Sequence, residues 1–256
     1  MKKIILSIVT ILMFSALQLK AVDDVKTYLA QADSLNKLFQ YEDALKILQD
    51  ADKKFPNNWK ILWRISREMV YIGNFMKDDD AREAQYTKAM EYADRAVKLA
   101  PDKSITYLRR AIANGKIALF KGVFSVGELV NSVKADLEKA IELGNGGDYV
   151  QAIAHYVLGR THAKVSEKWK PARSVLGLGW ADLDIALKEY ATAEKLYPGF
   201  AMIHLDYAKA LMRAEKYKEA KAELEKVLAA KILDKEDPQR KEEAKELLKE
   251  VNEELE

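Results

Sequence analysis

The side chains best suited to chemistry in this 256-residue chain are its three histidines and one short acidic run. His155 and His162 are seven residues apart, which on one helix puts them on the same face about 10 Å apart. That distance is too long for one metal ion without help from another element, so we interpret them as ordinary, partly buried histidines. Asp78, Asp79 and Asp80 offer oxygens suited to calcium, but the glycine-centred loop of such sites is missing. We expect no metal site, and we interpret the acidic run as like charges on a solvated loop.

The sequence carries none of the common enzyme motifs. It has no dinucleotide fingerprint, phosphate loop, nucleophile elbow or zinc-protease motif. The glycines within residues 176–180 do not follow an expected strand, so they do not predict a phosphate loop. There is no cysteine, which excludes disulfides and cysteine-ligated metals. We therefore predict no enzyme, no catalytic residue and no cofactor.

Composition points to a folded, helical protein without a nucleic-acid partner. The chain is 49% hydrophobic and 32% charged, which is too apolar for a disordered segment, and it has only 11 glycines and 5 prolines. The formal charge of +2 becomes −1 (+2 − 3) when the three lysines of residues 1–21 are removed. A nearly neutral protein exerts no general attraction on nucleic acid.

Residues 201–227 have the spacing of two packed amphipathic helices. Tyr207, Ala208 and Leu211 form one apolar face, and the facing stripe includes Ala220 and Leu224. Small alanines let two helices approach closely, and this pattern, on a period of about 34 residues, is the tetratricopeptide (TPR) signature. We predict an all-α, TPR-like α-solenoid, a right-handed superhelix of antiparallel helix pairs.

Four less regular copies precede this one and a helix follows it. The first copy predicts helices over 24–38 and 41–54. The next three contain extra residues at 74–82, 120–128 and 166–184, and we expect the first of these to be either an extended loop or a lengthened helix. The repeat body thus covers 22–234, and residues 235–256 predict a capping helix with one apolar stripe, which a repeat array needs on its last exposed face.

The N-terminal residues 1–21 have the features of a secretory signal peptide. Two lysines precede an apolar run over 4–17, which is shorter than the about 20 residues of a membrane-spanning helix. The alternative is an uncleaved N-terminal membrane anchor. In a bacterial cell either one predicts that the rest of the chain is exported, to the periplasm or otherwise outside the cytoplasm.

The first helices of stacked repeats line a concave surface, which we expect to be a partner-binding groove. Its aromatic and basic residues would suit an acidic or C-terminal peptide segment of an envelope protein, although the aromatics could instead be core and the cations scattered surface charges. A rival function is binding of a small organic anion, as an accessory to a transporter, if the 166–184 insertion closes the groove into a pocket. The oligomeric state stays open. The expected inward positions are Trp63, Arg67, Tyr71, Leu108, Ile112, Lys116, Tyr149, Tyr156, Arg160, Leu205, Lys209, Met212 and Arg213.

Three blocks extend the match beyond a general TPR protein. They are ILWRISRE at 61–68, KAMEYADRAVKLAPD at 88–102 and the run from His155 to Phe200 that contains Trp169 and Arg173. Their order and the long insertions resemble the regulator of microtubule dynamics family. The resemblance implies a helical-repeat protein without a catalytic constellation and, in a eukaryote, a microtubule-associated or organelle-anchored role. An exported bacterial protein would not meet tubulin, so the fold carries over better than the partner.

Overall fold

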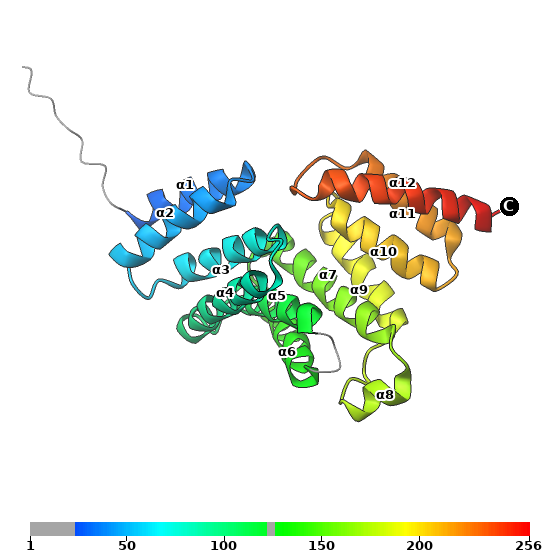
Figure 1. The fold of residues 1–256 in the computed structure, drawn as a ribbon, viewed down its shortest axis with the longest axis horizontal. Coiled ribbons are helices and arrows are strands. Elements are labelled where there is room, and N and C mark those ends of the chain that lie inside the picture. Colours follow the sequence, from blue (N-terminus) through cyan, green and yellow to red (C-terminus); the bar gives the residue numbers. More distant parts are fainter. Residues whose placement is uncertain (1–23, 122–125) are drawn as a thin grey trace, which may run out of the picture.

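The computed structural model describes residues 24–121 and 126–256, and every regular element in these two stretches is a helix (Figure 1). This confirms the all-α prediction. The expected signal peptide at 1–21 lies outside the described residues. No helix in the described part is long and apolar enough to cross a membrane. The helices are α1 (Val25–Lys37), α2 (Tyr41–Lys54), α3 (Trp59–Asn74), α4 (Asp79–Leu99), α5 (Ser104–Lys121), α6 (Gly127–Leu143), α7 (Gly147–Ser166), α8 (Lys170–Val175), α9 (Leu183–Leu196), α10 (Ala201–Arg213), α11 (Tyr217–Ala229) and α12 (Asp237–Glu254).

Successive helices pack as hairpins in the order α1–α2, α3–α4, α5–α6, α7–α9 and α10–α11. The helices of a hairpin touch at small alanines, as the spacing at Ala208 and Ala220 predicts. These two alanines and their counterparts Ala44 and Ala89 in earlier repeats are all fully buried. Larger side chains fill the space around them, including Leu48 and others in the continuous apolar clusters of the repeats. The TPR-like solenoid is therefore the observed fold.

The extra residues at 74–82 lengthen a helix. Helix α4 begins at Asp79, and the carboxylate of Asp78 accepts a hydrogen bond from the Ala81 backbone N–H at 2.7 Å. Acidic side chains at a helix N-terminus satisfy free N–H groups and face the positive end of the helix dipole. The expectation that this acidic run lies on a loop was wrong, because its residues cap and open α4.

The insertion at 166–184 contains the short helix α8 and folds back against α6 and α7. The indole N–H of Trp180 donates to the Asn131 side chain at 2.7 Å, and its ring meets the His162 ring edge-on. Arg173 is buried and donates to the backbone carbonyls of Lys168 and Ala181. These contacts hold the insertion at the tip of the α7–α9 hairpin, below the other helices in Figure 1.

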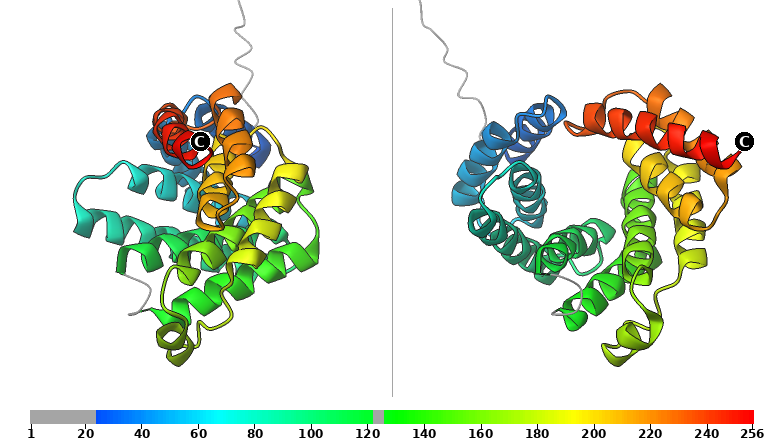
Figure 2. Two further views of the ribbon diagram at one scale, coloured as in Figure 1. Left: turned by 90° about the vertical axis from the view of Figure 1, so that its right-hand side faces the viewer. Right: turned by 45° about the vertical axis from the view of Figure 1, so that its right-hand side comes forward.

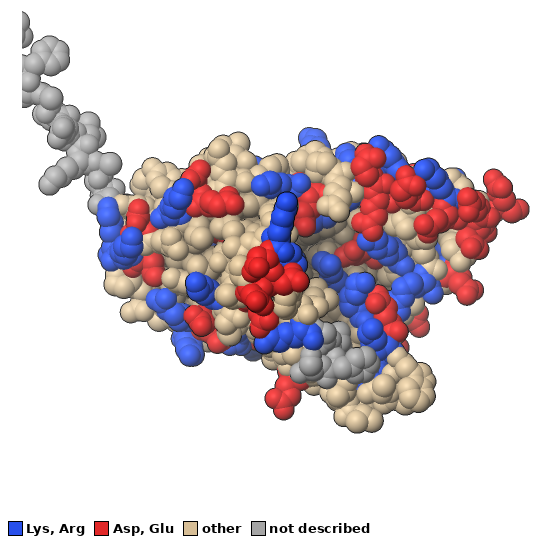
Figure 3. All heavy atoms as spheres, viewed as in Figure 1, with Lys and Arg blue, Asp and Glu red and all other residues tan. Residues whose placement is uncertain are grey.

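Helix α12 covers the last hairpin. Ala244 and Val251 are fully buried in the cluster formed with α10 and α11, and Leu247 and Leu248 pack beside them. Its other faces are strongly charged. Acidic side chains gather over α12 at the right of Figure 3, while both signs are interspersed elsewhere on that face.

The hairpins follow a curved path that brings the start of α12 back to the N-terminal repeats (Figure 2). We call residues 230–236, between α11 and α12, the closing segment. The Lys235 ammonium lies 4.7 Å from the centre of the Phe75 ring, and the Lys235 backbone and the Asp234 carboxylate lie close enough to the Tyr41 hydroxyl to influence its pKa. Tyr41 in turn stacks on Tyr71 with ring centres 4.7 Å apart. The concave side of the solenoid is thus bridged across its two ends.

Candidate functional site

Two adjoining cavities occupy the concave side. The inner cavity has a volume of about 180 Å³ and lies mainly between α3, α5, α7 and the start of α12. The outer cavity, of about 990 Å³, extends toward α1, the start of α3 and the closing segment. Because the two share wall residues, we treat them as one chamber with two parts. The shared residues are Arg67, Tyr71, Arg109, Tyr149, Met202 and Asp234.

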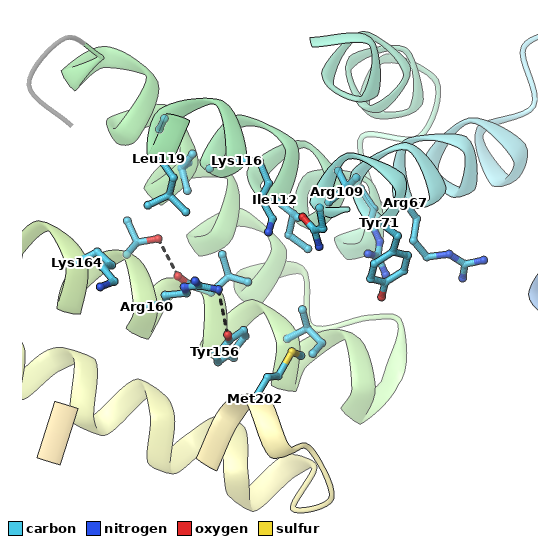
Figure 4. A pocket seen from close by; sticks show the side chains of 18 of the residues that line it. Arg67, Tyr71, Arg109, Ile112, Lys116, Leu119, Tyr156, Arg160, Lys164 and Met202 are labelled. Atoms are coloured by element: carbon cyan, nitrogen blue, oxygen red, sulfur yellow. Dashed lines mark hydrogen bonds between the residues drawn. The ribbon is translucent and has the colours of Figure 1, made fainter. Parts of the chain in front are cut away.

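Helix periodicity explains which side chains enter the inner cavity. Arg109, Ile112 and Lys116 recur at intervals of three and four residues on α5, which places them on one face. Tyr156 and Arg160 do the same on α7. All five line the inner cavity, and Figure 4 shows the two sets pointing into the space between their helices.

Arg109 was missed by the sequence analysis, which placed its neighbour Leu108 in the groove. The structure reverses this, since Leu108 is fully buried in the core between repeats while Arg109 lines both cavities. Arg109 lies three residues before Ile112, and that spacing was the signal available in the sequence. Its side chain is 6% exposed, its guanidinium lies 5.6 Å from the Trp63 ring centre, and its Nε has no hydrogen-bond partner among the described residues.

Arg160 is only partly neutralised. Its Nη1 donates to the Tyr156 hydroxyl at 3.3 Å, and its Nε lies 3.5 Å from a carboxylate oxygen of Asp206 without a hydrogen-bonding geometry. The same Asp206 oxygen accepts a 2.8 Å hydrogen bond from Tyr156. The Asp206 carboxylate therefore interacts with both Tyr156 and Arg160, and the Arg160 Nε donates no hydrogen bond.

Lys116 carries its charge in a poorly hydrated place. Burial lowers the pKa of its ammonium to about 8, and the nearby cations Arg160 and Arg240 act in the same direction. Glu236 and Asp234 act against this shift without outweighing it. Both carboxylates are already bonded to Arg240 at 2.7 and 3.2 Å. Lys116 makes no ion pair in the part of the chain that the structure describes.

Arg67 also lines both cavities, but its charge is fully engaged. Its guanidinium lies 2.8 Å from Asp33 and 2.6 Å from Glu68, and Arg64 makes a two-pronged contact with the same Asp33. Burial acts to raise the pKa of Asp33, but Arg64 and Arg67 outweigh it and hold that pKa below its usual value. This group ties α1 to α3.

The remaining groove predictions divide into two sets. Trp63, Tyr71, Tyr149 and Tyr156 line one or both cavities. Lys209, Arg213, Leu205 and Met212 line neither, and the last two pack in the apolar core of the C-terminal repeats instead. Lys209 pairs with Glu243 of α12 at 2.6 Å, while Arg213 donates to the Ala163 carbonyl at the end of α7 at 2.8 Å. The insertion at 166–184 lines neither cavity either, so the closing segment narrows the chamber in its place.

The histidines lie outside the chamber. His155 contacts Glu189 at 2.6 Å, and His162 accepts the Asp182 backbone N–H at 3.2 Å. His204 is buried with its two nitrogens bonded to Glu223 and the Pro198 carbonyl, at 2.7 and 2.8 Å.

Glu194, His204 and Glu223 are the single group of metal-type ligands close enough to share an ion in the described residues. The Lys226 ammonium bonds both carboxylates of that group, at 2.7 Å in the case of Glu223. A cationic side chain therefore already pairs with both carboxylates of this group.

The comparison with protein families agrees with this helical architecture. The family described as Regulator of microtubule dynamics protein 1-3 matches residues 28–252, which is most of the chain. The chain belongs to the regulator of microtubule dynamics family. The matched range contains the helix hairpins and the long middle repeats on which the resemblance rested. None of the curated protein sequences matches it.

Two of the solved structures similar to this family member are described as TPR proteins. The thermophilic TPR protein TTC0263 of Thermus thermophilus superposes with a TM-score of 0.62 at 18% identity, over 86% of this chain and 97% of that one. YrrB, described as a TPR protein with an unusual peptide-binding site, has a TM-score of 0.46 at 16% identity, over 87% and 92% of the two chains. At 18% identity the likeness to TTC0263 shows the fold and nothing about a ligand.

Proposed function

We propose that this protein is a non-catalytic interaction scaffold whose concave chamber holds an acidic or C-terminal segment of a protein partner. One observation carries the proposal: the side chains of Arg109, Lys116 and Arg160 point into one cavity, and the acids of the described residues do not fully neutralise their positive charges. Basic side chains in a partly dehydrated pocket attract carboxylates. A carboxylate on a partner segment supplies the missing charge.

The outer cavity suits the rest of such a segment. Its volume of about 990 Å³ is at the upper end of the about 300–1,000 Å³ typical of ligand sites. Trp63, Tyr71 and Tyr149 lie along it, and aromatic side chains give large contact areas at low entropy cost. An extended segment can therefore lie in the outer cavity with its acidic group in the inner one.

A small organic anion is the second candidate ligand. The closing segment narrows the chamber, and convergent cations in a closed cavity favour this alternative. Against it stands the volume of the inner cavity, about 180 Å³, which is below that of most small-molecule sites. We rank the protein segment first because it uses both cavities.

The cellular setting rests on residues 1–21 and on the family resemblance. The N-terminal leader supports an exported protein that acts in the cell envelope, either free or anchored by an uncleaved leader. The family name supports a microtubule-associated role if the source is eukaryotic. Cell fractionation with an antibody to the protein distinguishes these settings.

The test of the function is affinity capture with matched variants. The immobilised protein is incubated with envelope extract, bound proteins are eluted with salt, and each eluted protein is quantified. We expect a partner whose recovery falls at least about tenfold with Arg109→Gln plus Lys116→Gln and is unchanged with Lys188→Gln, an exposed position on α9. Equal recovery with all three proteins would contradict the chamber as the binding site.

A further inference from the structure

The inner cavity contains two of the few unsatisfied polar atoms of the described residues. In the described residues as a whole, four buried side-chain nitrogen or oxygen atoms have no hydrogen-bond partner, and two of them are the Nε atoms of Arg109 and Arg160. Buried donors are normally paired, so an unpaired one needs an explanation. Here both unpaired guanidinium donors line the same cavity, on facing helices.

The charges around this cavity do not balance. Lys116 points into it beside the two arginines, and like charges in a poorly hydrated space repel one another. The acids within reach have other partners, since Asp206 bonds Tyr156 and both Asp234 and Glu236 bond Arg240. Glu68 attracts Arg109 electrostatically but hydrogen-bonds Arg67 and Asn36. An anion from outside the described chain would relieve this imbalance.

The walls of the cavity restrict the kind of anion. Apart from the basic residues, the lining is largely aliphatic, with Ile112, Val133, Ile153 and Val157 among its members. A fully charged phosphate requires many donors, whereas a carboxylate takes two parallel N–H bonds from one guanidinium. A carboxylate next to an apolar side chain matches both the donors and the walls.

The connection to the outer cavity indicates how such a group arrives. Arg109, Tyr71 and Tyr149 belong to both cavities, so they form the passage between them. The inner cavity, at about 180 Å³, is large enough for one residue and its terminal group but not for a continuous strand. The closing segment limits it on the side of α12 through Asp234 and Glu236.

We propose that the inner cavity is a receptor for the C-terminal carboxylate of a partner chain with an apolar last residue, held by Arg109, Lys116 and Arg160. This inference rests on the proposed function, because it names the group by which the partner segment is recognised. The body of the segment occupies the outer cavity. The same recognition makes a neutral or blocked chain end a poor ligand.

The test uses two pools of short synthetic peptides that end in random apolar residues, one with a free C-terminal carboxylate and one with a C-terminal amide. Retention of both pools on the immobilised protein is measured for the wild type, Arg109→Gln, Lys116→Met and the surface control Lys188→Met. We expect the wild type and Lys188→Met to retain the acid pool about tenfold or more over the amide pool. Both chamber variants should bring that ratio close to one.

Lys116→Met separates binding from folding. Removal of a poorly hydrated charge should leave its midpoint of thermal unfolding equal to or above that of the wild type, so lost retention cannot be assigned to unfolding. Inorganic phosphate and octanoate are added as competitors in a second arm. Displacement of the acid pool by either one at equimolar concentration would overturn the chain-end assignment in favour of a free anion.

The remaining outcomes distinguish this inference from the function on which it rests. Equal retention of the acid and amide pools overturns the carboxylate receptor but leaves an interaction chamber in place. Retention of neither pool, combined with partner recovery that is insensitive to Arg109 and Lys116, overturns both.

Discussion

Two groups of basic residues line the same concave chamber and differ in one respect, the acids that accompany them. Arg67, with Arg64 beside it, is enclosed by Asp33 and Glu68 at 2.6–2.8 Å. Arg109 and Lys116 have no ion pair among the described residues. The first group connects two helices and has no charge to spare, whereas the second has unsatisfied charge directed at a cavity. A basic residue on a groove is thus a candidate ligand-binding group only when no acid of its own chain neutralises it.

The largest effect should follow from breaking the neutralised group. Glu68→Ala leaves the Arg67 guanidinium with one partner fewer and opens a cavity where a fully buried side chain stood. We expect a loss of about 3 kcal/mol in the free energy of unfolding, measured by urea denaturation. Glu68→Gln, which keeps the shape and the hydrogen bonds of the side chain, should lose less. A loss below about 1 kcal/mol for Glu68→Ala would show that the group is not structural.

The opposite sign is expected in the second group. The pKa of Lys116 is about 8 in the folded protein and 10.5 ordinarily, so between these values the unfolded state binds more protons. Wild-type stability should therefore rise with pH across that window and be lowest below pH 8. Lys116→Met should raise the free energy of unfolding at pH 7 by about 1 kcal/mol and remove that pH dependence. Urea denaturation at pH 7 and pH 9.5 measures both, and a variant less stable than the wild type at pH 7 would contradict the description of Lys116.

A substitution in the closing segment should have a smaller effect, on the local stability of the chamber wall rather than on the stability of the whole fold. Lys235→Ala removes the contact between the exposed ammonium and the Phe75 ring, which is worth about 0.5 kcal/mol at such a site. We expect faster amide hydrogen exchange in residues 230–236 with little change in global stability. The exposed Lys249→Ala on α12 is the control, and equal exchange in both variants would show that this contact does not hold the segment.

The smallest effect is expected at Lys209, a basic residue that was predicted to line the groove but lies outside both cavities. Lys209→Ala breaks a partly exposed pair with Glu243, and such pairs contribute about 0.5 kcal/mol or less. Retention of the acid-ended peptides should be unchanged, because Lys209 lines neither cavity. A clear loss of retention would extend the binding surface to α10 and α12.

The repeats are predictable from the sequence because their signals are local. The alanine spacing at Ala208 and Ala220 recurs in the other copies, and each copy was recognisable within its own residues. The acidic run at 78–80 was misjudged because the same residues suit a loop or a helix N-terminus, and only the observed start of α4 distinguishes the two. The error at Leu108 is a shift of one position along a helix, which moved Arg109 out of the expected groove.

The sequence by itself determined the helical hairpins, because 3.6-residue periodicity and small contact residues act between neighbours in the chain. Tertiary structure alone decided which basic side chains are neutralised. Asp33 and Arg67 are 34 residues apart, and the ends of the solenoid that meet at Lys235 and Phe75 are far more distant in sequence. Electrostatic pairing depends on the distance in space between the two charged groups. That distance is set by the small rotations between successive hairpins, which accumulate along the solenoid.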